Sequence, residues 1–129
     1  MPRTAEDIES YLVKMRMAYD QPKPGFWVVR GASGIDSFVI NMGGPVVVFR
    51  IKVMEVPKKN REELFRTLLE LNATDMIHGS YGLEGESVVL VDCLELENLD
   101  ENEFQATFDD MALAVSNHYQ RLAKFHAAA

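Results

Sequence analysis

The fold is decided by residues 87–122, which read SVVLVDCLELENLDENEFQATFDDMALAVSNHYQRL. The stretch opens with an apolar, β-branched run over Ser87–Glu95, which is typical of a strand. A helix is expected to begin at Asp100, a capping residue type, and to run to about Lys124. One helical stripe collects Phe104, Phe108, Met111, Val115 and Leu122. A stripe of this kind needs a sheet to cover it, so the sequence predicts an α+β domain.

Working outward from this stretch, the same patterns predict the remaining elements. Helices are expected over residues 4–19 and Asn60–Leu71. Further strands are expected at Phe26–Arg30, Ile35–Asn41, Val46–Val56 and Met76–Tyr81. The turns between consecutive strands are short, which demands antiparallel neighbours. The predicted order is α-βββ-α-ββ-α, a single domain over residues 1–129 with a five-stranded antiparallel sheet packed with helices.

Composition limits the classes of function. The 129 residues suit one domain, and 47% of them are hydrophobic. No apolar run is long enough for a membrane span, and the N-terminal MPRTAEDIES has no apolar signal region. The single cysteine, Cys93, suits a reducing compartment. We therefore expect a cytoplasmic protein with no membrane partner.

The charge is unevenly distributed along the chain. Residues 1–66 hold 11 Lys and Arg against 8 Asp and Glu, a net charge of +3, whereas residues 67–129 hold 2 against 12, a net charge of −10. An acidic half repels phosphate backbones, so nucleic acid is not an expected partner. It also favours solubility and can steer a basic partner.

No pattern of residues indicates catalysis, a metal or a cofactor. His78, His118 and His126 stand apart, and with the lone Cys93 they do not form metal-ligand spacing. The sequence contains no G-x-S-x-G, C-x-x-C or H-E-x-x-H motif. We therefore expect no catalytic, cofactor-binding or metal-binding residues, and a protein that is not an enzyme.

One carboxylate keeps an alternative open. Strand alternation places Asp92 among apolar neighbours, where a carboxylate needs a partner. With His78 and Tyr81 near the second hairpin, it could form the site of a small-molecule-binding or enzymatic domain. The structural alternative is a bulge, a rim position or a pair with an arginine such as Arg30.

The second helix is apolar on too wide an arc for one sheet. Leu64, Leu68 and Leu71 form one stripe, and Phe65 and Leu69 form a second. Together they span about 160°, against the roughly 100° that one sheet face requires. We expect a homodimer whose interface includes Phe65, Leu68 and Leu69. The alternative is that residues 73–75 or the N-terminal segment cover Phe65 and Leu69.

Other apolar residues are candidates for contact with a partner protein. Val13 and Met17 lie on the face of the first helix that should be wet, and Leu113 is similarly spare on the last helix. Phe26 and Trp27 point in opposite directions in a regular strand, so one of them could be an exposed anchor beside a sheet edge. The alternative is that both aromatic side chains are covered.

The second half of the chain contains several loose motifs, namely Leu68-Leu69-Glu70-Leu71-Asn72, Gly79-x-Tyr81, Val88–Val91 and Leu96-x-x-Leu99-x-x-x-x-Phe104. With these motifs the chain resembles the YbjN family, which has the type III secretion chaperone-like fold. The resemblance implies a homodimeric protein-binding module that holds a segment of a partner on apolar patches and strand edges, without ATP. It implies no catalytic residue.

Overall fold

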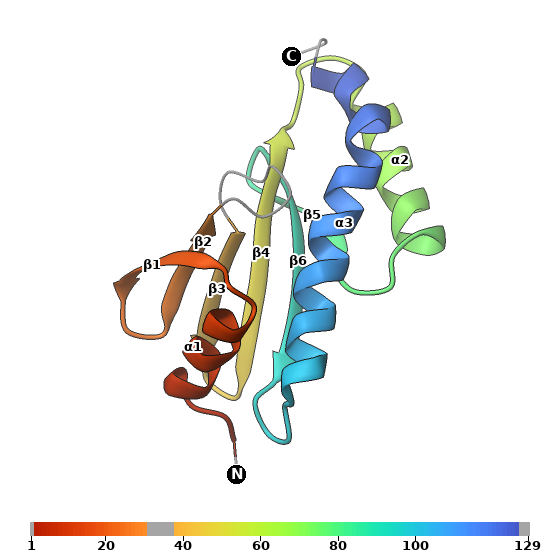
Figure 1. Cartoon of the computed structure of the whole chain (residues 1–129). Coiled ribbons are helices and arrows are strands. Elements are labelled where there is room, and N and C mark those ends of the chain that lie inside the picture. Colours follow the sequence, from red (N-terminus) through yellow and green to blue (C-terminus); the bar gives the residue numbers. More distant parts are fainter. Residues whose placement is uncertain (1, 31–37, 127–129) are drawn as a thin grey trace.

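The computed structural model describes residues 2–30 and 38–126, which form three helices and six strands in one sheet (Figure 1). In chain order these are α1 (Ala5–Lys14), β1 (Ala18–Lys23), β2 (Phe26–Arg30), β3 (Phe38–Gly43), β4 (Val46–Glu55), α2 (Arg61–Thr74), β5 (Ser80–Glu84), β6 (Ser87–Glu95) and α3 (Glu101–His126). The strands are antiparallel in the order β1-β2-β3-β4-β6-β5. Helices α1 and α3 lie over one face of the sheet, and α2 lies beside α3 next to β5. The predicted α+β class is confirmed, with six strands rather than five.

The extra strand arises because the first helix is shorter than predicted. Helix α1 ends at Lys14, and Arg16 adopts a left-handed φ of 59°, which turns the chain away from the helix. Residues 18–23 then form β1 instead of continuing the helix to residue 19. The two-residue turn Pro24-Gly25, in which Gly25 has a φ of 74°, pairs β1 with β2. Pro22 lies at a register shift in this edge strand, where a missing N–H group is tolerated.

The other predicted elements are present with shifted ends. Helix α2 continues beyond Leu71 to Thr74, and β5 begins at Ser80 rather than at Met76. Strand β3 is described from Phe38, and the predicted start of that strand at Ile35 lies outside the described residues. The N-terminal ends of α1 and α3, which sequence patterns place near residues 4 and 100, are both capped by side chains. Thr4 and Asp7 form a capping box, and the Asp100 carboxylate accepts a hydrogen bond from the Glu103 N–H at 2.7 Å.

The core lies between the sheet and the stripe of α3. Phe104, Phe108, Met111 and Leu122 are buried there, as predicted, and Phe125 extends the stripe toward the end of the helix. The Phe108 ring stacks on Phe38 of β3 with centroids 4.3 Å apart and planes 9° apart. Packed aromatic pairs of this kind fix the position of α3 on the sheet. Helix α2 lies beside α3 and contacts β5, so the position of α3 also bears on where α2 meets this edge strand (Figure 1).

Candidate functional site

An apolar surface lies where α2 meets the edge strand β5. Leu69 of α2 and Leu83 of β5 have exposed fractions of 69% and 53%, and the half-buried Phe65 lies beside them. The three side chains border a hollow of about 250 Å³ between the helix and the strand. We call Phe65, Leu69 and Leu83 the α2–β5 face. Neither residues 73–75 nor the described part of the N-terminal segment covers Leu69, which was the alternative to a dimer interface.

Leu68, which was also predicted in a dimer interface, lies on the inner side of α2. Its side chain belongs to the hydrophobic core and is almost fully buried. It supports the α2–β5 face from beneath and offers little area to another molecule. Leu83 was missed by the sequence because the strand was expected to end at Tyr81.

A side chain from α2 closes the beginning of the β5 edge. The Asn72 carboxamide accepts a hydrogen bond from the Tyr81 N–H at 2.7 Å and donates one to the Tyr81 carbonyl oxygen at 3.1 Å. Main-chain groups of an edge strand are otherwise available to a further strand. Asn72 lies at about 80° from Leu64 around the second helix, which is within its apolar arc. A polar residue inside an apolar arc could have indicated from the sequence that Asn72 has a specific hydrogen-bond partner.

The opposite edge of the sheet is β1, which follows α1 directly. Val13 of α1 is exposed and Met17 is half-buried. Trp27 is fully buried, and its Nε1–H donates to Glu9 Oε1 of α1 at 3.3 Å. The prediction that Trp27 could anchor a partner is therefore wrong, because α1 packs over it. Phe26 is half-buried and, by strand alternation, points to the face of the sheet away from α1.

The residues of the alternative site do not converge. Asp92 Oδ2 accepts from the Gly79 N–H at 3.1 Å, and its Oδ1 accepts from the Cys93 N–H at 2.8 Å. His78 Nδ1 lies 2.6 Å from Asp110 Oδ2. The Asp92 carboxylate thus holds the main chain that leads into β5. The suggested pair with Arg30 is not formed, because Arg30 pairs with Asp20 of β1.

Within residues 2–30 and 38–126, no three His, Cys, Asp or Glu side chains are grouped so that they could hold a metal ion. None of the helices within them is both long and apolar enough to cross a lipid bilayer.

A chain of polar groups joins α2, β5 and α3. Nδ1 of the buried His118 lies 2.7 Å from the Tyr81 hydroxyl oxygen, and its Nε2 lies 3.5 Å from Asp75 Oδ2. A neutral imidazole with its hydrogen on Nε2 accepts from Tyr81 and donates toward Asp75. Burial lowers the pKa of His118, and the Asp75 carboxylate partly opposes this shift. The network therefore favours the neutral imidazole and fastens α3 to both of its neighbours.

This network predicts a pH-dependent stability. Because the folded pKa of His118 is lowered, the unfolded chain holds the proton more tightly. The stabilisation is fully present above the unfolded pKa, about 6.5, and is lost as the pH falls through the lower folded pKa. We expect urea denaturation to give a flatter stability profile below about pH 7 for His118→Gln than for the wild type. His126→Gln, an exposed change on the same helix, is the control. Equal profiles for all three proteins would contradict this role.

Comparisons with known proteins agree with this architecture. The CesT_Tir_1 family model matches residues 1–128. The sequence has no significant match among curated proteins. Because the matched residues span almost the whole chain, the family assignment covers all of the surfaces described above.

Solved structures show the same fold at low sequence identity. YbjN from E. coli has a TM-score of 0.68 at 11% identity, over 92% of this chain and 93% of that chain. A chain of the heterodimeric ExoU–SpcU complex from the type III secretion system of Pseudomonas aeruginosa has a TM-score of 0.70 at 14% identity, over 85% and 93%. The Yersinia pestis type III secretion chaperone SycH, in complex with a fragment of YscM2, gives a structure with a TM-score of 0.64 at 8% identity, over 88% and 97%. The predicted resemblance is confirmed: the chain belongs to the CesT_Tir_1 family and has the type III secretion chaperone-like fold.

Proposed function

We propose that this protein is a non-enzymatic, dimeric, cytoplasmic module that binds a segment of a partner protein. The observation that carries the proposal is apolar exposure beside both edges of the sheet: Leu69 and Leu83 on the α2–β5 face, and Val13 near the β1 edge. Exposing apolar side chains to water is unfavourable in free energy, and a partner that covers them removes this unfavourable contribution. The similar ExoU–SpcU and SycH–YscM2 structures are complexes between proteins, which supports a binding role here.

The α2–β5 face is best suited to a second copy of the chain. Phe65, Leu69 and Leu83 come from two adjacent elements, so a two-fold axis through this surface would bring identical apolar patches together. Asn72 occupies the main-chain groups of Tyr81, so the two sheets would meet through side chains rather than by joining strand to strand. A specific interface of this kind buries at least about 1,000 Å² in total.

The β1 edge and the exposed side of α1 are then the surfaces for the partner segment. Strand addition needs free main-chain groups and nearby apolar pockets. Strand β1 is the sheet edge that no side-chain amide of the described residues closes, and three residues separate it from Lys14, the last residue of α1. Val13 and Met17 lie at that junction and would contact an extended segment paired with β1.

Affinity capture from the native cytosol tests this function. We expect the wild-type protein to retain a specific polypeptide, and Val13→Asp to retain much less of it, because a charge would replace an exposed apolar contact. Tyr119→Asp changes a similarly exposed apolar residue on α3 and is the matched control. Recovery of no polypeptide under gentle conditions, or equal recovery by all three proteins, would count against the proposal.

A further inference from the structure

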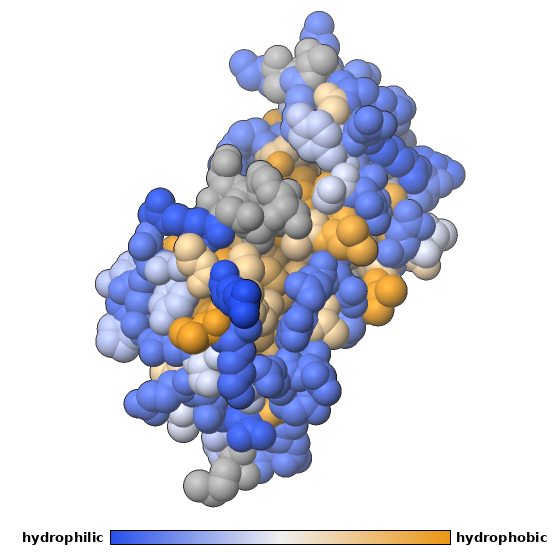
Figure 2. All heavy atoms as spheres, in the orientation of Figure 1, coloured by the Kyte–Doolittle hydropathy of each residue, from blue (hydrophilic) through white to orange (hydrophobic). Residues whose placement is uncertain are grey.

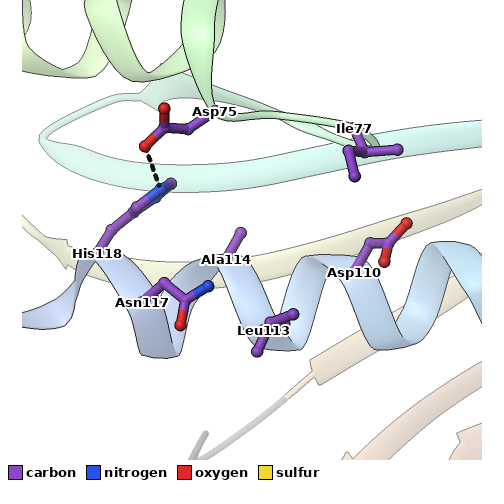
Figure 3. Close-up of a pocket in the computed structure, with 7 residues that line it drawn as sticks. All are labelled: Asp75, Ile77, Asp110, Leu113, Ala114, Asn117 and His118. Atoms are coloured by element: carbon purple, nitrogen blue, oxygen red, sulfur yellow. Dashed lines mark ion pairs between the residues drawn. The ribbon is translucent and has the colours of Figure 1, made fainter.

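A second hollow, of about 370 Å³, lies between α3 and the segment that joins α2 to β5 (Figure 3). Asp75 and Ile77 line it from the connecting segment, and Asp110, Leu113 and His118 line it from α3. The hollow shares no lining residue with the α2–β5 face. It therefore needs an explanation of its own.

The rim of this hollow is apolar to an unusual degree. Ile77 and Leu113 have exposed fractions of 83% and 57%, and they are two of the six large apolar side chains exposed among the described residues. Figure 2 shows hydrophobic atoms at the surface over α3 and beside it, in an otherwise hydrophilic region. An apolar rim around a polar hollow is the arrangement expected where an amphipathic group binds.

The two ends of the hollow are acidic. Asp75 Oδ2 lies 3.5 Å from His118 Nε2, and Asp110 Oδ2 lies 2.6 Å from His78 Nδ1. Among the described residues these imidazoles are the only ion-pair partners of the two carboxylates. The neutral His118 imidazole orients the Asp75 carboxylate by a hydrogen bond and leaves its negative charge uncompensated.

The cations of α3 are used elsewhere. Arg121 Nη2 lies 3.7 Å from Glu70 Oε1, and Lys124 Nζ lies 3.1 Å from Glu63 Oε1, so both face α2. No Lys or Arg lines the hollow among the residues described. An anion would be repelled by Asp75 and Asp110, and the side chains present do not form a metal site. A cationic group on a partly apolar stem matches both the charges and the rim.

We propose that this hollow binds an arginine or lysine side chain of a partner polypeptide, with a neighbouring large apolar side chain of the same segment resting on Ile77 and Leu113. The cation would contact the Asp110 carboxylate at one end of the hollow through a charge-assisted hydrogen bond, and the Asp75 carboxylate at the other end would add a more distant attraction (Figure 3). The net charge of −10 over residues 67–129 would attract the same segment from a distance. The proposal rests on the proposed function in one respect, namely that the ligand is a polypeptide.

Methyl NMR with synthetic peptides tests the site directly. The probe is acetyl-Gly-Leu-Arg-Leu-Gly-amide, and its neutral control carries citrulline in place of arginine. At about pH 7.5 and low salt we expect saturable shifts of the Ile77 and Leu113 methyl signals, with about tenfold weaker binding of the citrulline peptide. Equal affinity for the two peptides, or no shift at these methyls, would overturn the proposal.

Two variants make the test specific. Asp110→Asn keeps the shape of the side chain and removes one charge from the hollow, so we expect it to weaken binding of the arginine peptide by a factor of about three to ten. Asp109→Asn makes the same change at the adjacent exposed position and should leave binding unchanged. Equal effects of both variants would show that only the overall charge matters, and would overturn the site.

The outcomes also separate this site from the proposed function. If the arginine peptide fails to shift the Ile77 and Leu113 methyls while affinity capture still depends on Val13, this hollow is not a binding site and the proposed function stands. Shifts that follow the concentration of the protein rather than that of the peptide would identify a second copy of the chain as the occupant, and would also overturn the proposal.

Discussion

Replacing Phe108 with alanine is expected to lower the free energy of unfolding by roughly 3–5 kcal/mol. The ring is buried between α3 and the sheet, and it stacks on Phe38 of β3 at a centroid distance of 4.3 Å. Its removal would forfeit this aromatic contact and leave a cavity that close-packed neighbours fill only in part. A typical domain of this size is stable by about 5–15 kcal/mol, so the change would remove a large part of the total.

Urea denaturation monitored by circular dichroism measures this loss. The matched control is Leu113→Ala on the same helix, which removes an exposed side chain and should alter the free energy of unfolding by no more than about 0.5 kcal/mol. An unchanged midpoint for Phe108→Ala would show that the α3 stripe does not carry the core.

Leu69→Asp is expected to convert a dimer into a monomer. Light scattering at tens of micromolar should give the wild type about twice the protomer mass of 14.6 kDa, and should give the variant the protomer mass itself. Leu69 is the most exposed member of the α2–β5 face, so the change should not disturb the folded protomer. In a closed interface, however, the new carboxylate would lose its water without gaining a partner, which opposes association strongly.

Val13→Asp is the control for the dimer. It introduces the same charge at a similarly exposed position on α1, away from the α2–β5 face, and should keep the mass of the wild type. Circular dichroism should show folded protein for both variants. A wild-type mass of 14.6 kDa would contradict the dimer, and with it the role given to Phe65 and Leu69.

Elements defined by apolar periodicity could be predicted from the sequence. Helix α3 has a buried stripe and a local cap at Asp100, so its position depends little on the rest of the chain. Strand β1 could not be found this way, because among Ala18–Lys23 only Tyr19 is even half-buried. Its extended form depends on pairing with β2 across the Pro24-Gly25 turn, and prolines such as Pro22 and Pro24 indicate only that a helix does not continue there.

The surfaces were predictable only in part, because they too depend on contacts between different elements rather than on local patterns. The wide apolar arc of α2 correctly indicated that Leu69 is left over after the core is filled. Trp27 was misjudged because alternation along one strand does not show which face α1 covers. The hollow beside α3 is lined by both Asp75 and Asp110, which are 35 positions apart in the sequence, and no local pattern shows that they border one hollow.

The pair of hydrogen bonds from Asn72 to β5 depends on the side chain being an amide. Deamidation would turn its carboxamide into a carboxylate, which keeps an oxygen for the Tyr81 N–H but has no hydrogen to donate to the Tyr81 carbonyl oxygen. Two acceptor oxygens would then face each other, and α2 would lose one of its ties to the strand. The freed carbonyl is the kind of group through which sheets of separate molecules join. A molecule deamidated at Asn72 would therefore be more prone to edge-to-edge aggregation without any change in its gene.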